Sequence, residues 1–221
     1  MPPNFNSSVF INCPFDEEFA PILRAIVFVV IYLGFAPRLA TERSDAGENR
    51  LVKIMELIEG SRYSIHDLSR CQAQRKGEIF RLNMPFELGI DFGCRQYFGR
   101  GREEKRFLIL EEKPYRFQAA LSDISGCDIE IHGRDYFKAM TRVRAWLCQV
   151  AGCTAPGPTG LLGEYTTFQG WDYETRLQNG FSEADIKLLP TFDRMQSMRN
   201  WIAVGKPASI DRRGPGDVSN L

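Results

Sequence analysis

One acidic residue stands at a position suited to chemistry. The stretch Asn-Met-Pro-Phe-Glu-Leu-Gly at 83–89 predicts the first turn of a helix that carries Glu87. Asn83 is a favourable N-cap, and Pro85 fits a first turn because the N–H that it lacks would be unpaired there. The N–H groups at a helix N-terminus favour an ionised carboxylate by roughly 0.3–1 kcal/mol. Glu87 is therefore a candidate nucleophile or ribose ligand, although glutamates in first turns also serve helix stability alone.

Polar and aromatic residues follow two predicted strands. The apolar run 9–13 predicts a buried strand that Pro14 ends, and the run 62–68 predicts another strand with a polar finish. Residues at the carboxyl ends of these strands are Asn12, Phe15 and Asp16 for the first and His66, Asp67 and Ser69 for the second. The Glu87 helix begins beside both strand ends, so we expect the three segments to form one binding site.

Each of these residues also has a structural explanation. Asn12 can close a turn through its side chain, and Asp67 can cap the next loop or pair with a neighbouring arginine. Strand alternation turns His66 to the side opposite Asp67, which favours a structural or supporting role. Phe15 can stack on a nucleobase or simply pack. His132, on a later strand, is given no functional role.

The order of elements predicts the fold class. Short apolar runs alternate with segments whose apolar residues recur every three or four positions, as in strands alternating with helices. The predicted strands are 9–13, 35–40, 62–68, 107–110 and 128–131, and the predicted helices are 17–33, 51–58, one from 83, 116–124 and 136–150. We expect an α/β fold with a flavodoxin-like, doubly wound sheet of five parallel strands. Such a sheet binds ligands between its first and third strands.

Composition and missing motifs narrow the function. The chain has 28 Lys and Arg against 28 Asp and Glu, a balance that does not predict a nucleic-acid partner. Six scattered cysteines and two histidines do not predict a metal site. The longest apolar run, 25–35, is too short to span a bilayer, and no secretory signal precedes the first strand, so we expect a reducing cytoplasm and no membrane contact.

Three common nucleotide-binding and hydrolytic motifs are missing from the sequence. No GxGxxG follows the first strand, and the chain contains neither GxxxxGK[ST] nor GxSxG. A dinucleotide fold, a P-loop and a serine hydrolase therefore lose their usual support. A mechanism based on a carboxylate remains.

The composition changes after an α/β domain at 1–153. Residues 154–160 are rich in proline and glycine and predict a linker, and residues 161–205 predict a small helical module before a tail at 206–221. Ser182 with Asp185 predicts a capping box, and Thr191 a second N-cap. Two short helices cannot bury a stable core, so we expect them to dock on the α/β domain or another subunit and to cover the pocket. The docking residues expected are Trp171, Phe181 and Trp201.

Three motifs resemble one superfamily. Phe-Ile-Asn-Cys-Pro-Phe-Asp at 10–16, Ile-His-Asp-Leu-Ser-Arg at 65–70 and Met-Pro-Phe-Glu-Leu-Gly at 84–89 are similar to the superfamily that joins nucleoside 2-deoxyribosyltransferases with Toll/interleukin receptor (TIR) domains. TIR-like proteins of bacterial anti-phage defence resemble the chain most, over residues 8–150. The resemblance implies that Glu87 is the catalytic carboxylate and that Asp67 holds sugar hydroxyls. It also implies that residues after the first strand contact the nucleobase or nicotinamide.

The chain departs from both branches of this superfamily. Arg81 occupies the position where the transferases usually carry an aspartate, and Asn83-Met84 stand where TIR NADases often show Trp-Cys. These departures favour N-glycosidic cleavage in general over assignment to one branch.

The chemistry can also be argued from the residues. Breaking an N-glycosidic bond passes through an oxocarbenium-like state that a fixed anion stabilises or attacks. The cationic nicotinamide of NAD leaves without protonation, whereas a neutral base needs an acid, for which His66 or Asp67 are candidates. Burial raises the pKa of a carboxyl group, so we expect Asn83, backbone N–H groups or an arginine such as Arg43 or Arg50 to keep Glu87 ionised.

The leading hypothesis is an enzyme that cleaves the glycosidic bond of NAD or a related nucleotide in anti-phage immunity. It either hydrolyses this substrate or produces a cyclised or conjugated signal, and it needs no separate cofactor. The partners expected are a nucleotide and either further copies of the chain or a defence-system protein. Alternatives are a nucleoside 2-deoxyribosyltransferase or nucleotide N-glycosidase, and a non-catalytic TIR-like assembly module.

Overall fold

A computed structural model describes residues 4–43, 45–71, 81–116 and 121–209 of the 221-residue chain. The chain divides into two compact units, Met1–Pro158 and Thr159–Leu221, which we call the α/β unit and the helical unit. This division lies close to the predicted end of the α/β domain at residue 153. Part of the predicted tail, 210–221, lies outside the described residues.

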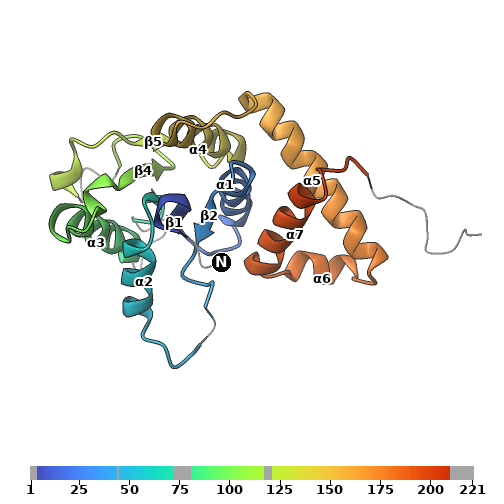
Figure 1. The fold of residues 1–221 in the computed structure, drawn as a ribbon, viewed down its shortest axis with the longest axis horizontal. Helices are drawn as coiled ribbons and strands as arrows, with labels where there is room; N and C mark the ends of the chain where they lie inside the picture. The colour runs from blue at the N-terminus through green and yellow to red at the C-terminus, as the bar shows by residue number, and fades with distance from the viewer. Residues whose placement is uncertain (1–3, 44, 72–80, 117–120, 210–221) are drawn as a thin grey trace, which may run out of the picture. The chain divides into compact units, whose positions relative to one another are not determined.

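One sheet of five parallel strands forms the centre of the α/β unit (Figure 1). The strand order is β2-β1-β3-β4-β5, which is the flavodoxin-like order, and each neighbouring pair is parallel. The strands are β1 (Ser8–Asn12), β2 (Ala36–Arg38), β3 (Tyr63–Asp67), β4 (Arg106–Glu111) and β5 (Glu130–Ile131). The predicted doubly wound α/β fold is confirmed.

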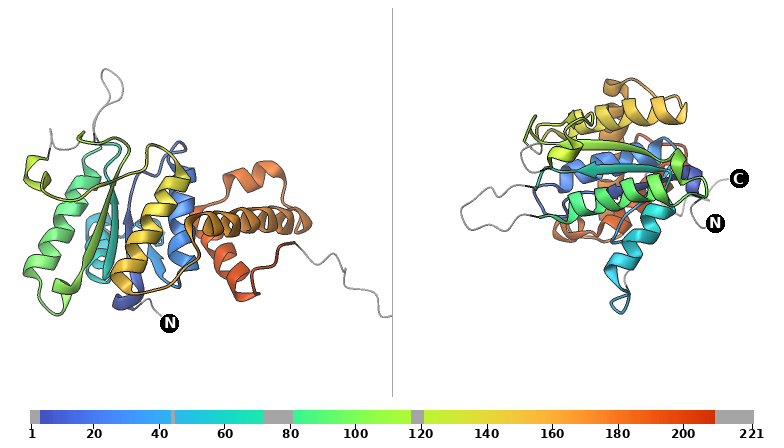
Figure 2. Two further views of the ribbon diagram at one scale, coloured as in Figure 1. Left: turned by 90° about the horizontal axis from the view of Figure 1, so that it is seen from above. Right: turned by 90° about the vertical axis from the view of Figure 1, so that its left-hand side faces the viewer.

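Helices cover both faces of this sheet (Figure 2). The helices α1 (Ala20–Tyr32) and α4 (Tyr136–Ala151) pack together on one face. The helices α2 (Arg50–Glu59) and α3 (Asn83–Tyr97) pack together on the other. Because both faces are covered, all residues of the central strands β1 and β3 are buried, and this is why those strands read as continuous runs.

The helix α1 is apolar because it is covered on most sides. Every residue from Ala25 to Ile31 is buried. Gly34 follows the helix with a φ of +85°, a left-handed conformation that favours glycine, and it ends the helix as predicted. The prediction began α1 about one turn too early, because Asp16 forms a separate turn. The Asp16 carboxylate accepts the N–H of Phe19 at 3.0 Å.

The helix α2 begins and ends at sequence signals. The Asn49 side chain accepts the N–H groups of the first turn, and Gly60 follows the last residue. Its buried face consists of Lys53, Ile54, Leu57 and Ile58. The helix predicted at 51–58 is thus confirmed, although Leu51 and Met55 are 41% and 42% exposed and do not belong to the buried face.

Some elements are shorter than predicted. The helix expected at 116–124 is seen only as a single 3-10 turn at Ser122–Ile124, and residues 117–120 lie outside the described part of the chain. The edge strands β2 and β5 have three and two residues instead of the six and four predicted. Most of the expected loop at 69–81 also lies outside the described residues.

The helical unit contains a long helix that the sequence interpretation missed. The helix α5 (Pro158–Gln178) begins inside the predicted linker 154–160, so that linker is shorter than expected. Its three internal glycines lower helix propensity, but Pro158 stands at the first position, where proline is tolerated. The shorter helices are α6 (Glu183–Leu188) and α7 (Thr191–Ala203). The capping box of Ser182 and Asp185 is confirmed, whereas Pro190 rather than Thr191 occupies the N-cap of α7.

Trp201 belongs to the interior of the helical unit. Its side chain is 0% exposed, its ring lies 5.7 Å from that of Phe168, and its Nε1–H donates to the carbonyl of Pro207 at 3.0 Å. Trp201 therefore packs within the helical unit, where α5 provides the third helix that two short helices lack, and its predicted docking role stays a prediction. Phe181 is 39% exposed, and its predicted docking role stays a prediction.

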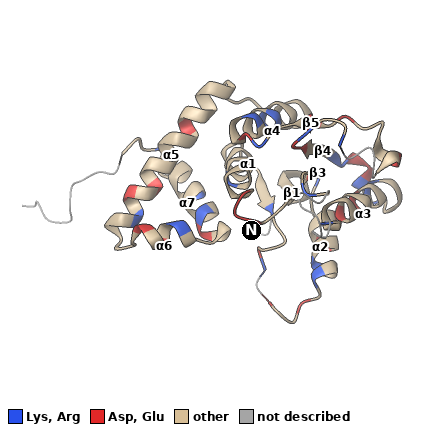
Figure 3. Ribbon diagram, turned by 180° about the vertical axis from the view of Figure 1, so that it is seen from behind, with Lys and Arg blue, Asp and Glu red and all other residues tan. Residues whose placement is uncertain are grey.

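Charged residues of both signs occur in both units (Figure 3). The signs are not evenly mixed, because α4 carries Lys138, Arg142 and Arg144 and no acidic residue. Over the whole chain, acidic and basic residues are equal in number. In the part of the chain that the structure describes, every helix is too short or too polar to cross a bilayer.

Replacing Trp201 by alanine tests its place in the interior. Trp201→Ala should lower the free energy of unfolding of the helical unit by about 3–5 kcal/mol, because it removes a fully buried aromatic side chain. Hydrogen exchange of the α7 amides and thermal denaturation measure this loss. Leu188→Ala, at a side chain that is 82% exposed, is the control and should change little. Unchanged stability together with weaker self-association would instead support the docking role.

Candidate active site

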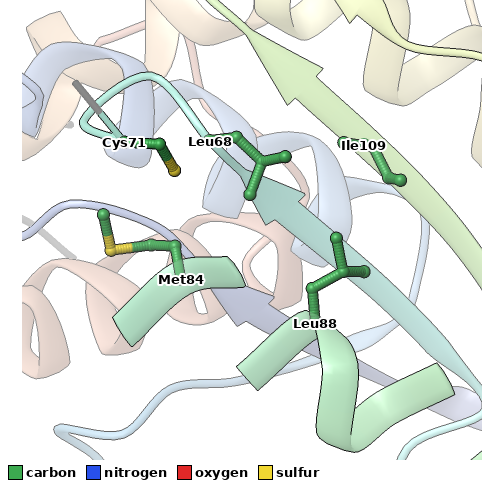
Figure 4. Packing of buried hydrophobic residues seen from close by; sticks show 5 residues of the cluster. All are labelled: Leu68, Cys71, Met84, Leu88 and Ile109. Carbon is green, nitrogen blue, oxygen red and sulfur yellow. The ribbon is translucent and has the colours of Figure 1, made fainter. Parts of the chain in front are cut away.

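Apolar side chains hold the start of α3 on the sheet. Met84 and Leu88 lie one turn apart on α3. They pack against Leu68 and Cys71, which follow β3, and against Ile109 of β4 (Figure 4). All five side chains are buried. This packing fixes the first turns of α3 beside the carboxyl ends of the strands, and so it determines the position of Glu87.

A cavity of about 500 Å³ lies between the end of β1 and the start of α3. Its size is within the range of sites for small molecules. The described residues that line it are Asn12, Cys13, Pro14, Phe15, Asp16, Arg50, Arg81, Asn83, Met84 and Glu87. Two of the three segments predicted to converge therefore meet in the cavity. The third segment, Asp67 to Arg70, does not line it.

Glu87 is the buried acid of this cavity. Glu87 is 6% exposed, and its carboxyl group forms no ion pair with the residues that the structure describes. Burial raises the pKa of Glu87 from 4.5 to about 7, and the positive charge of Arg50 opposes part of this rise. A buried carboxyl group with such a displaced pKa in a cavity is a candidate catalytic group.

The helix boundary differs from the predicted one, so Glu87 lacks the stabilisation by a helix N-terminus that was expected. The helix α3 already begins at Asn83, and its N-cap is Leu82, whose apolar side chain cannot accept a hydrogen bond from the first turn. Asn83 therefore does not cap the helix, and Glu87 lies beyond the first turn, where the helix dipole acts weakly. Of the groups expected to keep the carboxylate charged, Arg50 is the one that lowers its pKa.

Among the arginines that the structure describes, two line the cavity, and Arg43 is not one of them. Arg50 and Arg81 line the cavity. Arg43 instead pairs with Glu56 at 2.8 Å and with Glu48 at 3.0 Å. The position of Arg43 does not support its expected place in the site beside Glu87, because it pairs with two glutamates and does not line the cavity.

Asp16 is neutralised by two arginines. Its carboxylate lies 3.3 Å from Arg70 Nη2 and 3.3 Å from Arg81 Nη1. Asp16 lines the cavity as predicted. Its carboxylate is engaged in these ion pairs, so its role is to position the two arginines rather than to act as an unpaired acid. Beside it, Phe15 is 42% exposed and provides an aromatic surface at the cavity.

A buried chain of polar groups extends from Asn12 away from the cavity. The register of β1 and β3 places Asn12 next to His66, and Asn12 Nδ2 lies 3.0 Å from His66 Nδ1. His66 Nε2 lies 3.1 Å from Asp91 Oδ2, and Asp91 Oδ1 lies 3.1 Å from Lys105 Nζ. His66, Asp91 and Lys105 are 0% exposed. His66 thus supports Asn12 and does not itself line the cavity, contrary to its predicted role in binding substrate.

Asp67 and Ser69 are engaged below the surface. The Oδ1 atom of Asp67 accepts the N–H of Ser69 at 2.9 Å. His132 Nε2 lies 3.0 Å from both Asp67 Oδ2 and Ser69 Oγ. Both residues are buried and neither lines the cavity, so the structure does not bring them to Glu87 as a second catalytic acid and a substrate ligand. His132, which had no predicted role, fixes both of them.

Asp67, His132 and Ser69 do not form a nucleophilic triad. The Nδ1 atom of His132 accepts the N–H of Arg134 at 3.1 Å, so Nε2 carries the ring proton. With Nε2 protonated, it has no lone pair to offer, and His132 therefore cannot accept the proton of Ser69 Oγ, which lies 3.0 Å away. Within the described residues, no three His, Cys, Asp or Glu side chains are grouped to hold a metal ion.

Several contributing residues were missed from the sequence. Asp91 follows Glu87 by one helical turn and therefore shares its face of α3, a spacing that could have indicated a role. Lys105 had no such signal, because it precedes β4 as one of several charged residues. Cys13 lines the cavity, where burial and three nearby carboxylates raise the pKa of its thiol well above 9.0.

The structure brings five of the nine predicted site residues to the cavity. They are Asn12, Phe15, Asp16, Asn83 and Glu87. Comparisons with protein-family models, with curated proteins and with solved structures found no match. The site therefore stands on the geometry of this chain, and the resemblance to the TIR and deoxyribosyltransferase superfamily stays a prediction.

Titration of Glu87 tests the electrostatics of the cavity. Arg50→Met should raise the pKa of Glu87 above about 7, because it removes the charge that favours the carboxylate. Carbon-13 NMR of the glutamate carboxyl groups, assigned with Glu87→Gln, measures the midpoint. Arg43→Met removes an arginine that is committed to two glutamates outside the cavity and should leave the midpoint in place. Equal shifts in the two variants would contradict the assignment to Arg50.

Proposed function

We propose that the chain is an enzyme that cleaves the N-glycosidic bond of NAD or a related nucleotide, with Glu87 as the catalytic carboxylate. The observation that carries the proposal is a buried acid, without an ion-pair partner in the described residues, in a cavity of about 500 Å³ at the carboxyl end of a parallel sheet. A fixed anion at this place stabilises an oxocarbenium-like state or attacks the anomeric carbon.

The surroundings of Glu87 favour a substrate whose base leaves without a proton. Both histidines are turned away from the cavity into buried hydrogen bonds. Asp16 is paired with two arginines. Among the described lining residues, Glu87 is thus the acid left to react, and a neutral base would need a second one. The cationic nicotinamide of NAD fits this arrangement, and this favours the leading hypothesis over a deoxyribosyltransferase.

Two further features of the cavity favour a nucleotide over a free nucleoside. The guanidinium groups of Arg50 and Arg81 are suited to phosphate oxygens, which they can bind in a bidentate way. The exposed ring of Phe15 offers a stacking surface for a base. Phosphates, ribose and base of one ligand could thus each find a suitable group.

The biological setting rests on the sequence resemblance. Bacterial anti-phage immunity, further copies of the chain or a defence-system protein as partners, and a cyclised or conjugated product all stay predictions. The alternative of a non-catalytic assembly module makes an opposite prediction for Glu87→Gln, since that variant would keep its biological effect.

Removing the carboxylate tests the catalytic proposal. Glu87→Gln should reduce release of free nicotinamide from NAD at least about 100-fold, because the neutral amide cannot stabilise the developing positive charge. Mass spectrometry of nucleotides in cells that express either protein measures the change and retains any cellular activator. Glu56→Gln, at an exposed glutamate outside the cavity, is the control. Equal NAD consumption by wild type and Glu87→Gln rules the proposal out.

The pH dependence should report the same group. Below about pH 7 Glu87 is mostly protonated in the folded protein, and only its ionised form is catalytic. The kcat/KM for NAD should therefore rise with pH through about 7 and then level off, as a pH profile of initial rates would show. Arg50→Met should move the rise to higher pH. A rate that falls over this range would mean that Glu87 acts in its protonated form.

A further inference from the structure

The hydrogen bonds of Asn12 fix which way its amide group faces. Asn12 Nδ2 lies 2.8 Å from the carbonyl oxygen of Met84, in the first turn of α3. A carbonyl oxygen can only accept, so the atom that faces it has to be the amide nitrogen. The same nitrogen faces His66 Nδ1 at 3.0 Å. Both N–H bonds are thus used inside the protein, and Oδ1 is the atom left for a ligand in the cavity.

The partners of Asn12 are themselves fixed. His66 Nδ1 accepts from Asn12, so Nε2 carries the ring proton and donates it to Asp91 Oδ2 at 3.1 Å. Lys105 pairs with the other oxygen of Asp91 and donates to the carbonyls of Ile58 and Ser61. Each group has a partner of the opposite kind and the chain ends on backbone atoms, so reversing one amide would leave buried groups unpaired.

We propose that Asn12 is a specificity-determining residue whose Oδ1 offers the ligand a fixed hydrogen-bond acceptor. His66, Asp91 and Lys105 are then positioning residues that hold the Asn12 amide in this orientation. The inference rests on the proposed function. The ligand it selects presents a neutral N–H or O–H donor to Asn12 Oδ1. Beside the bond that is cleaved, NAD carries such donors on the carboxamide of nicotinamide and on the hydroxyls of the adjacent ribose.

The orientation can be tested without any substrate. In wild-type protein the side-chain N–H protons of Asn12 should exchange slowly with water, because both are held by buried acceptors. Nitrogen-15 NMR measures this exchange, and the signals are assigned by their loss in Asn12→Ala. His66→Leu removes one acceptor and should speed the exchange. Rapid exchange in the wild type would refute the proposed orientation.

The role in specificity is tested with matched substrates. Asn12→Ala should lower kcat/KM for NAD about 10- to 100-fold, because the ligand donor loses its buried acceptor. The substrates compared are NAD, its 3-acetylpyridine analogue, which lacks the amide N–H, and NAD without the 2′- or the 3′-hydroxyl of the nicotinamide ribose. The analogue that wild type and Asn12→Ala cleave with the same kcat/KM lacks the group that donates to Asn12, and so it identifies that donor. The same loss on every substrate would show a merely structural effect and overturn the proposal.

The positioning role is tested at His66. His66→Asn places an acceptor oxygen where Nδ1 stands, so it should retain the difference in kcat/KM between NAD and the analogue that lacks the donor. His66→Leu has no acceptor and should lose this difference in kcat/KM. If both variants discriminate like wild type, His66 does not position Asn12. A wild-type protein that cleaves none of these substrates, in cells or isolated, rejects the proposed function and the specificity role with it, while the amide exchange still decides the orientation.

Discussion

The burial of two carboxylates on successive turns of α3 is the constraint on which the site depends. Packing of Met84 and Leu88 against the strand ends draws this face of the helix to the sheet, and Glu87 and Asp91 are buried with it. Burial alone would raise the pKa of both groups. For Asp91 the hydrogen bond from His66 and the charge of Lys105 outweigh burial, and its pKa lies below the ordinary value. For Glu87 the charge of Arg50 does not outweigh it.

The same helix thus carries one acid that is paired in the interior and one acid that faces a cavity. Asp91 is ionised and held by groups that are themselves fully buried. Glu87 opens onto a cavity, where a bound ligand can add positive charge to that of Arg50. Two acids whose environments push their pKa values apart are typical of sites in which one group reacts and the other supports it.

The fold could be predicted from the sequence because its determinants are local. Apolar runs, Gly34 after α1 and the regular alternation of elements fix the strand and helix types, and parallel strands then allow few topologies. The helix α5 could not be predicted in this way. Its proline and glycines are typical of a linker, and its helical state depends on tertiary packing such as the contact between Phe168 and Trp201.

The site could be predicted only to the level of strand ends. The sequence placed Asn12 and Glu87 near the switch point of the sheet, and strand alternation separated His66 from Asp67 as observed. Which of these side chains reach the cavity depends on partners far away in the chain. His132 contacts Asp67 and Ser69 in the interior, and neither of them lines the cavity. Two glutamates pair with Arg43, which does not line the cavity either.

The two histidines show how such distant partners determine the chemistry. Each ring accepts a hydrogen bond at Nδ1 and donates from Nε2, so neither is arranged to pass a proton to the cavity. One orients the end of β1 through Asn12, and the other orients the end of β3 through Asp67. Their hydrogen bonds give the strand ends a fixed polarity and leave Glu87 as the acid that titrates near neutral pH. For the proposed reaction, such a site favours a substrate that brings its own positive charge, because the protein then has to supply only the anion and its position.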